Sequence, residues 1–244
     1  MCIAKCKIAD FNVSFKSDVK HLDKVLREYA ADFDKADISV DFTDSDVDFE
    51  KEIVKESAPK AYLTTYKITA LFRHLADQIP QYNSFVLHSA CFDVEGQGIA
   101  FAAHSGTGKT THMGLWQQRL GEKMVVVNGD KPIIRFFDDN PKTPYAYGSP
   151  WNGKERLGNN MRTELKHICF IERSATNYVE KVDKAAIVER IFKQVYMPKS
   201  PAAMAKTMEL MDKLISNCNL WIIHCNMDPQ AAVVAYNTIF GKSE

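Results

Sequence analysis

Residues 103–111 read Ala-His-Ser-Gly-Thr-Gly-Lys-Thr-Thr and give the clearest structural signal in this chain. They fit the phosphate-binding loop pattern G-x-x-x-x-G-K-[ST], with Ala103 in place of the first glycine. An apolar run over residues 99–103 is typical of a strand, and a helix is expected over residues 109–120. A strand, a glycine-rich turn and a helix in this order are the context that such a loop requires. We therefore predict an α/β fold with an anion site at this turn, rather than a turn that binds nothing.

The residue types in this loop suit a nucleoside triphosphate bound with Mg²⁺. Glycines allow the backbone N–H groups to curl around phosphate oxygens, and the N-terminus of the following helix attracts the same anion. A lysine at position 109 can reach the β- and γ-phosphates, and the Thr110 hydroxyl can ligate Mg²⁺. No guanine-reading N-K-x-D motif occurs, which favours ATP over GTP. The predicted cofactor-binding residues are Ser105, Gly106, Thr107, Gly108, Lys109, Thr110 and Thr111.

An acidic residue follows the next apolar run along the chain. Residues 123–127 are predicted to form a short buried strand, and Asn128-Gly129-Asp130 follows directly. A phosphate-binding loop usually works with an acidic residue at the end of a neighbouring strand, which holds the water shell of the metal. We predict that Asp130 and Thr110 are the metal-side residues. The alternative is an aspartate that only shapes a turn.

Composition and charge narrow the classes of partner. The chain has 244 residues, of which 45% are hydrophobic and 25% charged, as in ordinary globular proteins. Its 31 basic and 31 acidic side chains cancel, so no global field favours nucleic acid, and we expect no nucleic-acid partner. The apolar stretches fall far short of the ~20 residues that span a bilayer, and residues 1–10 do not resemble a signal peptide. We expect a cytoplasmic protein with no membrane partner.

The hydrophobic pattern divides the chain near residue 84. Residues 1–83 are predicted as an N-terminal α/β portion packed on the core, with a long helix over 59–79 that Pro80 ends. Residues 84–244 are predicted as the P-loop kinase-like core domain. Its expected strands cover residues 85–94, 98–103, 123–127, 131–137, 167–172 and 220–225. Residues 138–158 are rich in Pro, Gly and Asn and are predicted to be a loop.

Residues 147–162 are a candidate lid over the phosphate site. Lys154, Arg156 or Arg162 could neutralise the charge of a transferred phosphoryl group. Trp151 could stack on a ligand. The alternative is a surface loop with scattered charges.

The order of these motifs resembles the catalytic domain of HPr kinase/phosphorylase. Leu87-His88-Ser89-Ala90, a hairpin, the phosphate-binding loop and Asn128-Gly129-Asp130 follow one another at close spacing. Residues 105–111 are similar to the loop of ATP-dependent phosphoenolpyruvate carboxykinase, which shares that catalytic fold. Residues 220–235 are similar to the last strand and helix of small HPr-kinase-like proteins. The resemblance covers residues 85–240 in outline and leaves residues 1–83 unmatched.

The resemblance implies an α/β catalytic core of the HPr kinase and phosphoenolpyruvate carboxykinase type, with an N-terminal α/β portion. It implies that Lys109 and Thr110 take phosphate and metal, that Asp130 is the second residue of an acidic pair, and that His88 lies near the phosphates. Gly129 stands where the family carries the first acidic residue, its candidate general base. The glycine-rich signature that follows in HPr kinases is replaced by residues 148–156. Carboxykinase activity would require a longer chain.

The predicted function is ATP- and Mg²⁺-dependent transfer of the γ-phosphoryl group to a hydroxyl acceptor, either a small molecule or a protein serine. Lys109, Asp130 and His88 are the predicted catalytic residues. Gly129 supports an alternative, a nucleotide-binding sensor with weak or no turnover, and a bifunctional kinase/phosphorylase is a third reading. An acidic residue from elsewhere in the fold near Asp130 would favour the active kinase. The sequence does not identify the acceptor, and it does not decide whether the chain forms a homo-oligomer.

Overall fold

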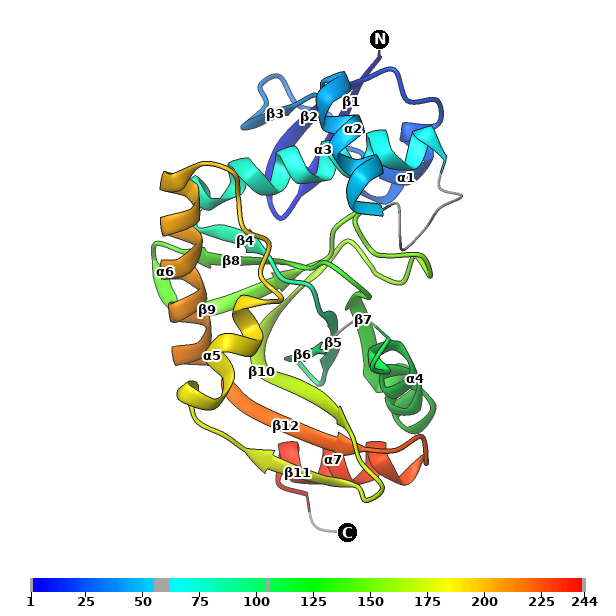
Figure 1. Ribbon diagram of the computed structural model, residues 1–244, viewed down its shortest axis with the longest axis vertical. Helices are drawn as coiled ribbons and strands as arrows, with labels where there is room; N and C mark the ends of the chain where they lie inside the picture. Colours follow the sequence, from blue (N-terminus) through cyan, green and yellow to red (C-terminus); the bar gives the residue numbers. More distant parts are fainter. Residues whose placement is uncertain (1, 55–61, 104–105, 243–244) are drawn as a thin grey trace.

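The N-terminal part of the chain forms a small sheet with helices packed against it (Figure 1). The structure is a computed structural model that describes residues 2–54, 62–103 and 106–242. Strands β1 (Cys2–Ile8) and β2 (Phe11–Ser17) form an antiparallel hairpin, and β3 (Ile38–Val40) pairs parallel to β2. The two turn residues, Ala9 and Asp10, both have positive φ, as the tight hairpin turns that match strand twist require. The helices of this part are α1 (Leu22–Leu26), η1 (Arg27–Tyr29), α2 (Asp44–Val54), α3 (Leu63–Gln78) and η2 (Ile79–Tyr82).

The rest of the chain is built on a large mixed sheet in the order β4-β8-β9-β10-β6-β5-β7, with β12 beside β10 and β11 beside β12. Its strands are β4 (Ser84–Val86), β5 (Ala90–Val94), β6 (Gln97–Ala102), β7 (Met124–Asn128), β8 (Ile133–Phe137), β9 (Asn140–Tyr147), β10 (Arg162–Arg173), β11 (Tyr178–Lys181) and β12 (Asn219–Cys225). Strand β10 connects the two halves of this sheet. Its first residues pair antiparallel with β9, and its later residues pair parallel with β6 and β12. The described residues therefore confirm a mixed α/β fold.

Helices cover both faces of the large sheet (Figure 1). Alternate residues of β6 point to opposite faces, so Ala100 and Ala102 belong to one apolar cluster and Ile99 and Phe101 to another. The first cluster includes residues of α5 (Lys184–Phe192) and α6 (Pro201–Asn217). The second includes residues of α4 (Lys109–Leu120) and α7 (Gln230–Phe240). The glycine-rich loop thus connects a largely buried strand to a helix that is anchored in the core.

A third apolar cluster joins the N-terminal part to the large sheet. Leu71 and Phe72 of α3 belong to the same buried cluster as Val86, Ile133 and Tyr147. These residues come from β4, β8 and β9, so the N-terminal part packs on the half of the sheet that lies before β10. The two parts of the chain share one core.

Two segments of the large sheet differ from the sequence expectation. Residues 138–158 were expected to be a loop, yet β9 runs through Pro141 and Pro144. Both prolines lie outside the part of β9 that pairs with β10, where a missing N–H costs no ladder hydrogen bond to that strand. Residues 85–94 were expected to form one strand, but the chain breaks at residues 87–89 and the two pieces pair with different neighbours.

A buried histidine on α4 makes the stability of the fold depend on pH. His112 accepts a hydrogen bond at Nε2 from the Trp116 indole at 3.2 Å, and burial lowers its pKa to about 4. Below about pH 6.5 this histidine is protonated in the unfolded chain but stays neutral in the folded chain. The free energy of unfolding therefore falls between about pH 6.5 and pH 4. His167, which accepts a hydrogen bond from Trp221 at 3.2 Å, has its pKa lowered to about 4 in the same way.

We expect His112→Gln to reduce the loss of unfolding free energy between pH 7 and pH 5 by about 2 kcal/mol, because the amide does not titrate. Urea unfolding at the two pH values measures this difference. His167→Gln serves as the comparison and should reduce the pH-dependent loss of unfolding free energy by a similar amount. An identical pH dependence in wild type and in both variants would contradict the assignment.

Candidate functional site

The glycine-rich loop between β6 and α4 has the backbone that an anion-binding loop needs. Gly106 has φ +77° and Gly108 has φ +120°, conformations that side-chain-bearing residues rarely adopt. Gly108 is also the residue from which α4 begins, so the N-terminus of this helix faces the loop. A Cβ at either glycine would meet no atom within 4 Å, so backbone conformation rather than crowding calls for glycine. Of the predicted loop residues, Ser105 lies outside the described part of the chain, as does His104 beside it.

Lys109 lies across the base of this loop. Its Nζ donates a hydrogen bond to the carbonyl oxygen of Ala103 at 3.0 Å. Burial lowers the pKa of Lys109, and the charge of Asp130 offsets part of that effect. No acidic side chain within the described residues forms an ion pair with this ammonium, so its charge is available to an anion in the loop.

Asp130 is fixed directly after β7 by a turn that Asn128 builds. The Asn128 Oδ1 accepts hydrogen bonds from the N–H groups of Asp130 at 2.9 Å and Lys131 at 2.7 Å. The buried amide of Asn128 in turn donates to the Ser149 carbonyl and hydroxyl, both at 3.1 Å. The turn at residues 128–131 and the segment that carries Ser149 therefore hold the position of this aspartate.

The carboxylate of Asp130 is ionised and has two basic neighbours. The His88 Nε2 lies 3.2 Å from Oδ1, and the Lys131 ammonium contacts Oδ2. Burial raises the pKa of Asp130, but the hydrogen bond from His88 and the charge of Lys131 outweigh it and hold the pKa well below its usual range. A carboxylate that stays ionised throughout the physiological pH range is suited to binding a cation.

His88 lies at the break between β4 and β5, and the backbone fixes it there. Its N–H donates to the Gln194 carbonyl at 2.7 Å, and the next N–H, that of Ser89, donates to the Asp130 carbonyl at 2.9 Å. The missing strand pairing at residues 87–89 is thus replaced by contacts that bring this histidine to Asp130.

These groups surround one cavity of about 450 Å³. It is lined by His88, Gly106, Gly108, Lys109, Thr110, Thr111, Gly129, Asp130, Gly153, Lys154 and Glu155. The structure therefore brings together most of the loop residues, the histidine, the aspartate and one candidate lid cation.

Three other candidate lid residues lie away from this cavity. Trp151 packs on Phe72, with 5.9 Å between ring centroids, and Arg156 lines a neighbouring hollow. The Arg162 guanidinium donates to the Tyr147 hydroxyl at 2.9 Å and lies 3.3 Å from an Asp10 oxygen. Arg162 consequently joins the N-terminal hairpin to the sheet and does not face the glycine-rich loop.

Gly129, which stands in place of a family acid, is tightly enclosed. A Cβ at this position would lie 3.1 Å from the Leu157 Cβ and 3.2 Å from the Leu157 carbonyl oxygen. The Gly129 N–H also donates to that carbonyl at 2.8 Å. The loop that carries Leu157 has therefore taken the space next to Gly129, and a longer side chain there would have to displace it.

Sequence reasoning missed two residues of the site. Glu155 lines the cavity beside Asp130. Arg173, at the end of β10, donates from Nη2 to the Gly106 carbonyl at 2.7 Å and from Nε to the Thr107 carbonyl at 3.4 Å. Arg173 directly follows the expected strand at residues 167–172, but no motif marked it as part of the site. No sequence signal singled out Glu155.

Comparisons with known proteins add one distant likeness. No family model matches the chain, and no curated protein matches it. Among solved structures, it is similar to the Hpr(Ser) kinase/phosphatase from Coxiella burnetii, with a TM-score of 0.35 and 8% sequence identity. The match covers 64% of this chain and 91% of that chain. No helix among the described residues is long and apolar enough to cross a bilayer.

Proposed function

We propose that the chain is an ATP- and Mg²⁺-dependent kinase that transfers the γ-phosphoryl group to a hydroxyl acceptor. One observation carries the proposal: a glycine-rich loop with Lys109 at its helix start shares a cavity with an ionised Asp130. Phosphoryl transfer depends mostly on positioning and charge stabilisation, and this cavity offers both.

The residues present suit a nucleotide bound with Mg²⁺. Mg²⁺ is usually bound by one or two carboxylates together with substrate phosphates and waters, rather than by a cage of protein ligands. Asp130 and the exposed Thr110 hydroxyl fit that pattern, and within the described residues no cluster of three or more His, Cys, Asp or Glu forms a cage. A bound Mg²⁺ would neutralise charge on the phosphates. Lys109 and the loop N–H groups would hold those phosphates in place, and Arg173 would keep the loop in shape.

Glu155 supplies the second carboxylate that turnover calls for. Asp130 is engaged by His88 and Lys131, whereas Glu155 forms no hydrogen bond or ion pair with another described residue. We assign Glu155 the role of accepting the proton of the acceptor hydroxyl, because it lines the cavity from the side of the covering loop. An acid from outside the expected motif thus favours the kinase over the sensor.

A nucleotide sensor is the second candidate, and the enclosure of Gly129 favours it. The position where the family carries its candidate base has no room for a side chain without movement of Leu157. If Glu155 does not act in its place, the cavity binds nucleotide without turning it over.

The deciding experiment measures ADP formation from ATP and Mg²⁺ across a panel of hydroxyl-bearing metabolites and serine peptides. We expect slow turnover that EDTA abolishes and that one class of acceptor increases. Glu155→Gln should lower turnover while ATP binding persists, whereas Glu122→Gln, a change of the same kind at an exposed site outside the cavity, should not. ATP binding without turnover in wild type would establish the sensor instead.

A further inference from the structure

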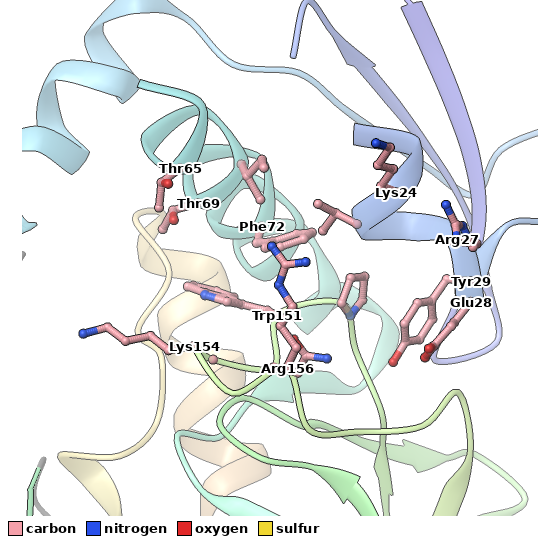
Figure 2. A pocket seen from close by; sticks show the side chains of 15 residues that line it. Lys24, Arg27, Glu28, Tyr29, Thr65, Thr69, Phe72, Trp151, Lys154 and Arg156 are labelled. Carbon is pink, nitrogen blue, oxygen red and sulfur yellow. The ribbon is translucent and has the colours of Figure 1, made fainter. Parts of the chain in front are cut away.

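A second and larger hollow lies between the N-terminal part and the loop after β9 (Figure 2). Its volume is about 600 Å³, within the usual range for a site that encloses a small molecule. One wall comes from α1 and η1, another from α3, and the floor from residues 150–156. The segment that the family resemblance leaves unmatched therefore builds most of this hollow.

The hollow is positively charged in a chain that has no net charge. Lys24, Arg27, Lys154 and Arg156 line it against one acid, Glu28, so four positive charges and one negative charge give +3. None of the four cations forms an ion pair with another described residue. In Figure 2 Lys24 and Arg27 come from one side and Lys154 and Arg156 from the loop below. An excess of unpaired cations around a concave space favours an anionic ligand.

Backbone conformation supports a binding role for Arg156. Its φ is +51°, in the left-handed region that arginine seldom occupies. Such conformations cluster at ligand sites, where the surrounding structure maintains them. Here the conformation places a charged side chain of the loop in the hollow.

The hollow also has an apolar side. Phe72 and Trp151 line it, and their rings lie 5.9 Å apart between centroids at an interplanar angle of 32°. Val25 and Ile68 add aliphatic surface. Trp151, which the sequence suggested could stack on a ligand, thus presents its ring to this second space.

The two cavities lie on either side of one loop and share two of its residues. Gly153 and Lys154 line both. Gly153 has φ +78°, and a Cβ on it would lie 3.0 Å from the Asp130 Cβ, so glycine allows the loop to approach the aspartate closely. On the other side, the Lys131 ammonium contacts Asp130 and lies 5.0 Å from the Trp151 ring centroid. A molecule in the second hollow would lie across this loop from Asp130.

We propose that this hollow is the acceptor site and that its ligand is a small hydroxyl-bearing molecule with a carboxylate or phosphate group and an apolar part. The inference rests on the proposed kinase function for its chemical step: the acceptor hydroxyl attacks the γ-phosphorus, the bond to the ADP oxygen breaks, and Glu155 takes the hydroxyl proton. The N-terminal part then selects the acceptor. Binding itself requires no nucleotide, so it can be tested separately.

The test measures binding of simple probes through fluorescence. The other two tryptophans, Trp116 and Trp221, are buried and line no part of the hollow, so Trp151 is the one expected to respond. Wild-type protein without nucleotide is titrated with phenylacetate and with benzyl alcohol as the uncharged counterpart. Phenyl phosphate is titrated into Lys109→Ala, because phosphate can also enter the glycine-rich loop. The two anions show whether carboxylate or phosphate is preferred.

We expect at least one anion to change the fluorescence saturably, and Trp151→Phe to abolish the change. Lys24→Gln, Arg27→Gln and Arg156→Gln should each weaken binding at least about threefold, since each removes a charge-assisted contact. Lys142→Gln, an exposed lysine on β9 outside the hollow, is the matched control and should bind as wild type does. Lys154 is left unchanged because it lines both cavities.

Equal binding of benzyl alcohol and the anions, equal binding in all the charge variants, or no response to either anion would overturn the proposal. Each of these results is independent of ATP. A chain that binds the anions but never consumes ATP would refute the kinase function and keep the anion site. A chain that consumes ATP but fails these titrations would keep the kinase function and refute the site.

Discussion

Lys109→Ala is expected to remove most of the rise in melting temperature that ATP with Mg²⁺ gives the wild-type chain. A ligand that binds only the folded state stabilises it by about 2.7 kcal/mol at a concentration of 100 Kd. The variant loses the one ammonium at the start of α4 that lies against the glycine-rich loop. A loss of two orders of magnitude in affinity would reduce that stabilisation to less than about 0.5 kcal/mol.

The unliganded variant should remain folded, because the ammonium makes only the hydrogen bond to the Ala103 carbonyl, and one such bond contributes about 1 kcal/mol. Differential scanning fluorimetry with and without ATP measures both effects. Lys142→Ala is the matched control, since this exposed lysine lies on β9 and does not line the cavity that contains the loop. Equal thermal shifts in wild type and Lys109→Ala would show that this loop does not bind the nucleotide.

The features that sequence predicted best are those fixed by neighbouring residues. Gly106 and Gly108 are needed for backbone angles that the loop itself imposes, and the continuous apolar run before them indicates the buried strand. Asp130 could be placed for the same reason, since it directly follows a strand. The neighbouring residues in the sequence were enough to predict where these residues lie.

The features that sequence could not place depend on contacts between distant segments. Arg162 was a candidate for phosphoryl charge, but its register on β10 sets it opposite Tyr147, whose hydroxyl accepts from it. Trp151 and Glu155 lie in one irregular loop, yet one faces α3 and the other faces the glycine-rich loop. An irregular loop has no periodicity from which the direction of a side chain could be predicted. The path of the loop is set instead by contacts such as Gly129 N–H to the Leu157 carbonyl.

The same loop explains why the N-terminal part matters for the site. Residues 150–156 line the second hollow together with α1, η1 and α3, and Gly153 closely approaches Asp130 on the other side of the loop. Sequence assigned residues 1–83 no role, because nothing in them resembles a catalytic motif. In our proposal these residues line the second hollow, and residues that line a hollow act through their charge and shape. They carry no fixed spacing of reactive groups that a sequence motif could reveal.

Asp130→Asn is expected to lower Mg²⁺-dependent turnover at least about tenfold while leaving the fold intact. Asparagine has nearly the same shape but carries no charge, so it loses the attraction for the cation that an ionised carboxylate provides. Tenfold corresponds to about 1.4 kcal/mol, the lower end for one charge-assisted contact. The structural cost is small, because the Asn128 side chain bonds the backbone N–H of residue 130 and not its carboxylate.

The Mg²⁺ titration separates a metal-side role from a structural one. If Asp130 holds the cation, the variant should need a higher Mg²⁺ concentration for half-maximal rate, and excess Mg²⁺ should recover part of the activity. His88→Ala should lower turnover less, because the imidazole contacts the carboxylate without replacing its charge. Asp139→Asn, an exposed aspartate outside the cavity, controls for loss of an acidic side chain as such. If Asp130→Asn keeps full turnover with the wild-type Mg²⁺ requirement, the cation is held elsewhere, and Glu155 becomes the carboxylate to test.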